Sequence, residues 1–222
     1  MKVKFILKKE VANNIICYRF TKPANYHYLA GQYAEFHLPH NNMDDRGDIR
    51  WFTLSSAPYQ QYLEITTKHD PINSSSFKLA LKNIKKNDML DIKEAMGDYV
   101  LPINKNAKLF FIIGGIGITP LLSILKEAKH HNQKRNINIH YIVNKDQQIK
   151  LNPYSDIIQT LYLYHKKELF KISEIISSIK SLRGSNYFLY LSGPEKMVIS
   201  LNNALKKQLD PSKIIQDYFE GY

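Results

Sequence analysis

The chain is poor in cysteine. Its 222 residues include one, Cys17, which excludes an internal disulfide and a four-cysteine iron–sulfur cluster held by this chain alone. Because Cys17 stands between Ile16 and Tyr18 in an apolar segment, we expect a small core residue rather than a redox thiol. So little cysteine is typical of a reducing compartment, and a cytoplasmic location is therefore expected.

Long apolar segments are also missing. The sequence contains no run of about 18 apolar residues, so no membrane span is predicted. The segment Met1–Glu10 alternates like a strand and lacks the apolar stretch of a signal peptide. The eight histidines show no metal-ligand pattern, so no metal site is expected.

Acidic residues are outnumbered by basic ones, 20 against 31, which gives a net charge of +11. A basic excess suits a nucleic-acid partner, but the lysines are spread along the chain instead of massed in one run, and no such partner is predicted. An acidic protein partner explains the charge equally well, because complementary fields speed encounter. A biased genome composition would give the same excess.

The composition, 44% hydrophobic and 23% charged, is that of a folded protein with enough residues for one large domain or two small ones. The pattern of the first part, up to about Leu101, is alternating and interrupted by turns, which indicates an antiparallel barrel or sandwich. The expected strands are Val3–Lys8, Ile15–Phe20, Tyr33–Leu38, Arg50–Ser55, Tyr62–Lys68 and Met89–Glu94. One helix is expected from Phe77 to Ile84, capped by the serines Ser74–Ser76.

After Pro102 the period changes, with a boundary near 101–106. Continuous apolar runs predict strands that are buried on both faces, alternating with helices, which indicates a doubly wound parallel sheet. The expected strands are Lys108–Ile113, Ile137–Val143, Thr160–Tyr164, Tyr187–Leu191 and Ile214–Phe219. Helices are expected at Ser173–Leu182 and Pro194–Leu209, and a further one should be capped by Thr119 and begin at Pro120.

Three short motifs stand out. Arg50-Trp51-Phe52-Thr53 places a cation, an aromatic ring and a hydroxyl along one strand, and Arg50 and Phe52 should share a face. Gly114–Pro120 is a glycine turn between a buried strand and a helix, the context in which backbone amides and a helix N-terminus bind a pyrophosphate. Ser192-Gly193-Pro194 follows another apolar strand.

In this order the motifs resemble those of the ferredoxin–NADP reductase family of flavoproteins, and the resemblance covers nearly the whole chain. It implies an FAD-binding antiparallel β-barrel domain at 1–101, followed by an NAD(P)-binding α/β domain at 106–222. It also implies FAD and NADPH or NADH as cofactors.

The resemblance assigns roles on the flavin side. Arg50 would bind phosphate, Phe52 would stack on the flavin ring and Thr53 would lie beside flavin N5. The family usually has Tyr at the Phe52 position, so a phenolic hydrogen bond is lost here. Further expected FAD contacts are Trp51, Thr67, Lys68, Ser75, Ser76 and Phe77. A buried strand with an edge arginine and an ordinary helix cap remain open as alternatives, and a glycine common in the family at this helix start is missing.

On the nicotinamide side, the expected contacts are Gly115, Ile116, Gly117, Thr119, Ser192, Gly193, Pro194 and Met197. Serine stands at 192 where the family often has cysteine. A plain tight strand–helix turn is the alternative for the glycines. Asn144 and Lys145 would contact the ribose end; Lys145 favours the 2′-phosphate of NADPH whereas Asp146 argues for NADH, so the preference for NADPH is weak.

The last residues complete the expected site. Phe219 or Tyr222 would stack on the flavin, and Glu220 would relay a proton; the alternative is a frayed terminus. The resemblance thus implies an FAD-dependent NAD(P)H oxidoreductase with Thr53, Ser192, Glu220 and Tyr222 as catalytic residues. Electrons would pass to a separate acceptor such as an acidic ferredoxin or flavodoxin. The alternatives are a flavin or ferric-chelate reductase, a subunit of a larger electron-transfer complex, or a basic binding module that retains only the fold.

Overall fold

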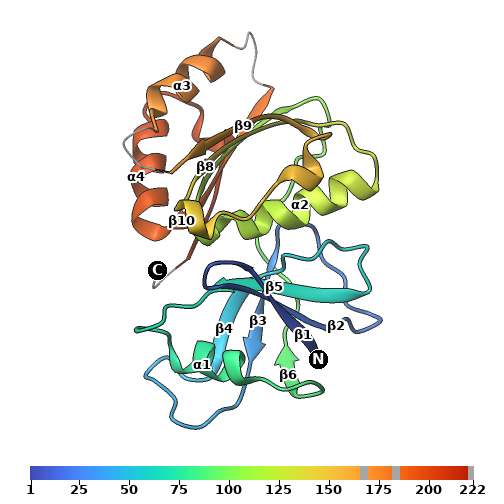
Figure 1. The fold of residues 1–222 in the computed structure, drawn as a ribbon. Coiled ribbons are helices and arrows are strands. Elements are labelled where there is room, and N and C mark those ends of the chain that lie inside the picture. The colour runs from blue at the N-terminus through green and yellow to red at the C-terminus, as the bar shows by residue number, and fades with distance from the viewer. Residues whose placement is uncertain (166–169, 182–185, 220–222) are drawn as a thin grey trace. The chain divides into compact units, whose positions relative to one another are not determined.

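The structure is a computed structural model that describes residues 1–165, 170–181 and 186–219 (Figure 1). The chain divides into two compact units. Unit 1 comprises Met1–Val100 and Thr119–Glu127, and unit 2 comprises Leu101–Ile118 and Ala128–Tyr222. Each unit is described by itself below. The expected domain bounds, 1–101 and 106–222, stay predictions.

Unit 1 contains a six-stranded antiparallel sheet in the order β4-β3-β6-β1-β2-β5. The strands are β1 (Lys2–Ala12), β2 (Ile15–Thr21), β3 (Tyr33–His37), β4 (Ile49–Thr53), β5 (Tyr62–Lys68) and β6 (Met89–Ile92). Just after β4, Leu54 bridges Ile65 of β5, and the Ser55 amide donates to the carbonyl of Glu64, also in β5, at 2.8 Å. These contacts close the sheet into a barrel, so the expected antiparallel barrel is confirmed.

The barrel is filled by alternate side chains of its strands, as a half-buried sheet requires. Phe20, Phe36 and Phe52 lie in this core, and Phe77 enters it from helix α1 (Ser76–Asn83). The Ser75 hydroxyl accepts a hydrogen bond from the Lys78 amide at 3.3 Å and caps α1, as predicted for this serine run. Packing of Phe77 therefore fixes where the first amides of α1 point.

Helix α2 (Ile118–His130) contributes Thr119–Glu127 to unit 1. Lys126 Nζ donates to the Ser55 carbonyl and pairs with the buried Glu64 carboxylate, both at 2.8 Å. Glu64 also pairs with Arg19 at 2.8 Å. Although burial opposes it, the charges of Lys126 and Arg19 hold the pKa of Glu64 below its ordinary value. This network fixes the closure of the barrel.

Unit 2 contains a five-stranded parallel sheet in the order β11-β10-β7-β8-β9. The strands are β7 (Lys108–Gly114), β8 (Asn136–Ile142), β9 (Ile158–Tyr164), β10 (Tyr187–Pro194) and β11 (Ile214–Phe219). The chain runs outward from β7 through β8 to β9, then returns to β10 on the other side of β7. The strand order therefore reverses between β7 and β10, and in such sheets ligands bind beyond the carboxyl ends at this switch point.

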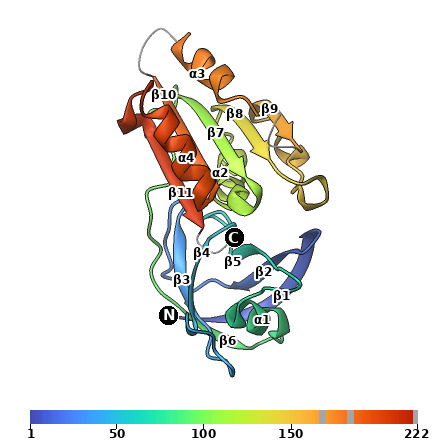
Figure 2. The same cartoon turned by 90° about the vertical axis from the view of Figure 1, so that its left-hand side faces the viewer.

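Helices α3 (Ile172–Lys180) and α4 (Glu195–Leu205) cover one face of this sheet with Ile175, Ile179, Val198 and Leu205. Figure 2 shows α4 lying over β10 and β11. Three short 3-10 helices, Lys145–Gln147, Asn152–Tyr154 and Pro211–Lys213, occupy connections. The expected doubly wound parallel sheet is confirmed, and no helix in the described part of the chain is long and apolar enough to cross a membrane.

The start of α2 differs from the prediction. Gly115–Gly117 forms a 3-10 helix that runs directly into α2 at Ile118. Thr119 is therefore the second residue of the helix rather than its cap, and Pro120 is the third. The physical reason is that the Ile118 amide already donates to the carbonyls of Gly115 and Ile116, so the helical turn begins before Thr119.

Candidate functional site

The candidate flavin side of unit 1 centres on the N-terminus of α1. The Arg50 guanidinium donates to Asp44 Oδ1 at 2.9 Å, and the backbone amide of Ser76 donates to Asp44 Oδ2 at 2.9 Å. A carboxylate thus lies between an arginine and the first amide of a helix, the two kinds of donor that bind phosphates in proteins. The structure brings the predicted Arg50 and Ser76 to one anion.

Arg50 and Phe52 share a face of β4, as their spacing predicts. The guanidinium carbon of Arg50 lies 5.5 Å from the centre of the Phe77 ring, and the Phe52 ring lies 5.7 Å from the same ring. Phe52 is 7% exposed and also packs on Phe36. Its packing is that of a core residue, and stacking of Phe52 on a flavin stays a prediction.

Trp51 occupies the opposite face of the strand. Its side chain is 64% exposed, and the indole N–H donates to Glu35 Oε2 at 3.3 Å. The alternation of β4 therefore separates Trp51 from Arg50 and Phe52. Its expected part in cofactor binding is not tested by this position and stays a prediction.

Basic side chains also act on the first turn of α1. Burial, together with the charges of Arg46, Lys68 and Arg50, lowers the pKa of Lys78 to about 7, against the opposing charge of Asp70. These four basic side chains outnumber the carboxylates of Asp44 and Asp70. Sequence reasoning included Lys68 but missed Arg46, Asp44 and Lys78. The position of Lys78, in the first turn of α1 after the serine cap, was an available signal.

Thr53 is the buried hydroxyl of this side. It is 3% exposed, and its Oγ1 has no hydrogen-bond partner among the described residues. Thr67 is also buried, at 1% exposed. A buried hydroxyl without a partner is costly unless something else bonds to it. Thr53 is thus a group that a ligand would satisfy.

The candidate nicotinamide side lies at the switch point of unit 2. The Ser192 hydroxyl donates to the Gly117 carbonyl at 2.7 Å. A Cβ atom on Gly117 would lie 2.5 Å from the Gly193 nitrogen, so the two backbones can pass this closely only because Gly117 has no side chain. The structure therefore brings the two predicted motifs together at the carboxyl ends of β7 and β10.

Gly115, unlike Gly117, has open space beside it. Its φ of +52° suits glycine, and a Cβ built on it would meet nothing within 4 Å. Open space beside a glycine at the end of a parallel strand lets a ligand approach the backbone. Ile116 and Thr119 are buried, at 7% and 2% exposed, and the Met197 side chain packs against Gly114. Pro194 ends β10.

The other predicted residues lie at neighbouring strand ends. Asn144 and Lys145 follow β8 and are exposed. Phe219 pairs with Pro194 in the β10–β11 ladder, which brings the backbone of the predicted tail to the Ser192–Pro194 motif. Glu220 and Tyr222 lie outside the described residues, so their predicted roles stay predictions.

Asp217 on β11 is a residue that sequence reasoning did not select. It pairs with Ser192 in the ladder, and its Oδ2 is buried without a hydrogen-bond partner among the described residues. Burial raises the pKa of Asp217 to about 6, against a weaker opposing hydrogen bond from the Tyr218 amide. An acidic residue in a final strand whose other residues, except Gln216, are apolar or aromatic was the available signal.

Neither a cluster of metal ligands nor a reactive thiol is found in the described part of the chain. In residues 1–165, 170–181 and 186–219, no three His, Cys, Asp or Glu side chains gather as metal ligands would. Burial raises the pKa of Cys17 to about 12, with the Glu64 charge adding to it. The Cys17 thiol is therefore protonated at neutral pH, in agreement with a structural role.

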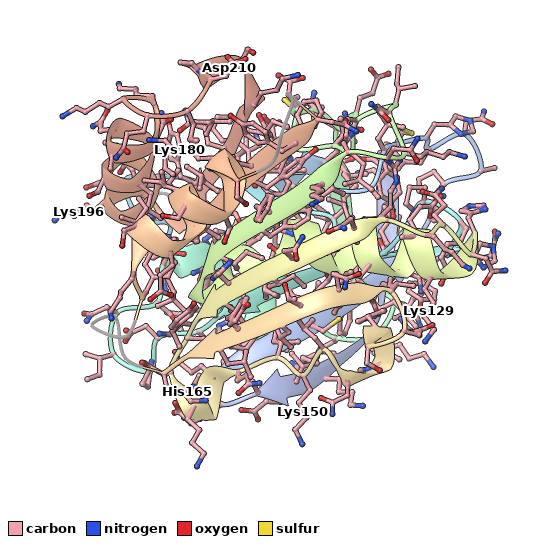
Figure 3. The ribbon with its side chains drawn as sticks, turned by 90° about the horizontal axis from the view of Figure 1, so that it is seen from above. Lys129, Lys150, His165, Lys180, Lys196 and Asp210 are labelled. Carbon is pink, nitrogen blue, oxygen red and sulfur yellow. The ribbon has the colours of Figure 1, made fainter. Side chains whose placement is uncertain are left out.

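The basic side chains of unit 2 are dispersed. Lys129, Lys150, Lys180 and Lys196 come from different elements and are exposed, and Figure 3 shows Lys129 and Lys150 well apart from Lys180 and Lys196. Their separation agrees with the dispersed charge along the sequence.

Comparison with known proteins gives the following similarities. The flavohemoprotein A of Dictyostelium discoideum is 31% identical over 163 residues, which is 68% of this chain and 41% of that protein. A Bacillus anthracis flavohemoprotein is 26% identical over 152 residues, 64% of this chain and 37% of that protein. The chain thus matches well under half the length of these curated relatives. No protein-family model matches the chain.

Solved structures resemble nearly the whole chain. A ferredoxin–NADP+ reductase from Plasmodium falciparum with 2′P-AMP has a TM-score of 0.78 and 23% identity, and covers 98% of this chain and 95% of its own. A flavohemoglobin from Malassezia yamatoensis with bound FAD and heme has a TM-score of 0.76 and 20% identity, covering 98% and 59%. These likenesses show the fold, and they confirm the resemblance predicted from the motifs.

Proposed function

Because this chain has the fold of ferredoxin–NADP+ reductases, we propose that it is an FAD-dependent oxidoreductase that takes hydride from NADPH or NADH. Bound FAD would supply the chemistry, since a flavin accepts hydride and passes electrons on singly or in pairs. The residues of the chain bind, orient and tune the two cofactors.

The observation that carries the proposal is the set of donors at the N-terminus of α1. Arg50, the Ser76 amide and Lys78 would hold the pyrophosphate of FAD. The Arg50 Nε is buried without a partner among the described residues, which leaves a donor for a further acceptor. The unsatisfied Thr53 hydroxyl would donate to, or accept from, the edge of the flavin ring. These groups fit the cofactor.

The glycine segments of unit 2 support a dinucleotide there. The space beside Gly115 would take the pyrophosphate of NAD(P)H, and the amides of the turn would bond to it. Ser192, whose hydroxyl is already bonded to the Gly117 carbonyl, would shape the floor for the nicotinamide ring. Lys145 would add a contact to the 2′-phosphate of NADPH.

The electron acceptor we propose first is an acidic ferredoxin or flavodoxin, because the chain carries a net charge of +11. The similarity to flavohemoproteins favours a haem group as the second candidate. A ferric chelate, a free flavin or a larger complex are further alternatives. A cytoplasmic location is part of the proposal, since the chain has one cysteine, as is typical of proteins in a reducing compartment.

The test begins with the purified full-length chain after incubation with FAD. We expect flavin absorption that is retained on gel filtration, extraction of FAD rather than FMN, and anaerobic bleaching by NADPH or NADH. A protein that retains no flavin would instead be the binding module that keeps only the fold. Bound flavin that neither nicotinamide bleaches would rule out the proposed activity.

The next experiment compares electron acceptors. The rate at which the reduced protein reduces ferredoxin, flavodoxin, a haem protein and ferric citrate is measured at low salt and at about 0.5 M salt. An acidic protein acceptor should lose most of its rate at high salt, because surface charges are screened. A rate that salt leaves unchanged would argue for a small oxidant instead.

A further inference from the structure

The Asp44 carboxylate occupies the anion position at the N-terminus of α1. Its Oδ1 accepts from the Arg50 guanidinium and its Oδ2 from the Ser76 amide, each at 2.9 Å. The contact is reciprocal, because the Asp44 amide donates to the Ser76 hydroxyl at 2.9 Å. The donors that would hold a phosphate therefore already hold a carboxylate of the same chain.

Asp44 reaches this position from a connection between two paired strands. β3 ends at His37 and β4 begins at Ile49, and the Leu38 amide donates to the Asp48 carbonyl at 3.0 Å across the base of the connection. Its tip is held on α1 by Asp44 and by a 3.0 Å hydrogen bond between His40 Nε2 and the Ser76 hydroxyl. Neither contact belongs to the ladder of β3 and β4, so the loss of both would leave the paired strands intact.

The carboxylates of this region do not balance its cations. Arg46, Arg50 and Lys68 act on Lys78, with Asp70 as an opposing charge, and Arg46 lies 3.9 Å from Asp44 Oδ2. A carboxylate brings one negative charge to these cations, whereas a pyrophosphate brings at least two. A pyrophosphate therefore gains more from the same donors than Asp44 does.

We propose that Asp44 is an internal competitor for the pyrophosphate of FAD, and that binding of the cofactor displaces its carboxylate from Arg50 and from the N-terminus of α1. Asp44 would thereby set the affinity of the site and select ligands with more negative charge than one carboxylate. The identity of the ligand as FAD rests on the proposed function, whereas displacement of Asp44 by an anion does not.

A different role for Asp44 would have the opposite sign. If the carboxylate only held Arg50 in the orientation that receives phosphate, its removal would weaken anion binding. A competitor, when removed, leaves the donors open and strengthens binding. The direction of the change in affinity therefore distinguishes the two roles.

The test compares Asp44→Asn with Asp45→Asn in the full-length chain, stripped of flavin. Asn keeps the size of the side chain and removes one negative charge, and the exposed Asp45 provides the same change at the next residue of the same loop. Inorganic pyrophosphate is titrated by calorimetry and FAD by quenching of its fluorescence. We expect both to bind D44N roughly 5- to 20-fold more tightly than the parent, and D45N within about twofold of it.

Asp44→Ala serves as a second variant in case the asparagine amide retains the Ser76 contact, and circular dichroism checks that each variant is folded. Equal or weaker binding of pyrophosphate by both Asp44 variants overturns the proposal, as does the absence of pyrophosphate binding in every protein. Tighter pyrophosphate binding by D44N without FAD binding in any protein supports the role of Asp44 and contradicts the proposed flavin function. If the parent and all variants bind FAD with one affinity and pyrophosphate with one affinity, the role of Asp44 is overturned and the proposed flavin function is not.

Discussion

The two candidate anion sites of this chain are built from different parts of the polypeptide. In unit 1 the donors include charged side chains, chiefly Arg50, and an opposing carboxylate, Asp44, already balances part of their charge. In unit 2 the Gly114–Ile118 segment has no charged side chain, and the site depends on backbone amides and close approach. Ligand binding at the first site should therefore depend on charged side chains and on salt concentration. Binding at the second site should depend on whether the glycines carry a side chain.

The largest effect should come from Gly117→Ala. Its new Cβ would lie 2.5 to 2.6 Å from backbone atoms of Ser192 and Gly193, and backbone cannot move aside cheaply, so we expect a loss of about 3 kcal/mol in the free energy of unfolding. Reduction of bound flavin by NADPH should also be lost. Urea unfolding and stopped-flow reduction measure the two effects.

Gly115→Ala is the matched control in the same turn. Its Cβ would meet nothing within 4 Å, but its φ of +52° is unfavourable for alanine, so the loss should be about 1 kcal/mol. Equal losses for the two variants would contradict the close approach at Gly117.

Arg50→Ala tests the side-chain site. Loss of a charge-assisted pair should weaken FAD binding by roughly 1.5–3 kcal/mol, and Asp44, left without its partner, would add repulsion. The affinity of the parent for FAD should fall with salt more steeply than that of the variant. Lys9→Ala, which removes the same charge from strand β1, is the control and should bind FAD like the parent. Unchanged FAD affinity in R50A would make Arg50 a structural residue only.

Asp217 supplies the test by pH. Its pKa is raised from 3.8 to about 6 by burial, so the folded state holds the proton more tightly than the unfolded state. The contribution of Asp217 to stability is therefore greatest below about pH 4 and is lost as the pH rises through about 6. Asp217→Asn should remove this loss and stabilise the protein by roughly 1–3 kcal/mol at pH 7, with no gain below pH 4.

Asp210→Asn is the control of opposite sign in the same unit. Hydrogen bonds from the hydroxyl and the amide of Ser212 lower the pKa of Asp210, so its charged form is favoured in the fold and D210N should not stabilise the protein at pH 7. Thermal unfolding across pH 4 to 8 measures both variants. A parental pH dependence in D217N would show that Asp217 ionises as it does in the unfolded chain.

The sequence predicted the repetitive parts of the fold well, because burial imposes a period on them. Tyr62–Lys68 and Ile214–Phe219 have the expected bounds, since alternation or an apolar run defines each. The glycine motif was recognisable because the apolar strand before it and the helix after it could be predicted from their sequence patterns. The start of α2 was predicted wrongly because a 3-10 turn and a capped helix place glycine, threonine and proline at similar spacing.

What escaped prediction depends on contacts between distant residues. Asp44 lies in an irregular loop whose sequence carries no period, and only the fold brings it to Ser76, 32 positions later. Lys78 reads as an exposed helical lysine until Arg46 and Lys68 are placed beside it. The burial of Asp217 follows from the pairing of β11 with β10, which local sequence does not encode.

The smallest predicted effect concerns the choice between NADPH and NADH. Here the side chain of Lys145 would add one contact to a site that otherwise consists of backbone amides. Lys145 is exposed after β8, and an exposed ion pair with a 2′-phosphate contributes at most about 1 kcal/mol. Lys145→Ala should therefore raise the KM for NADPH up to about fivefold and leave the KM for NADH unchanged. Lys150→Ala removes an exposed lysine of the same unit, seen at its edge in Figure 3, and should change neither value. If K145A raised both KM values equally, Lys145 would act only through its charge on both cofactors. It would then not contribute to any preference for NADPH over NADH.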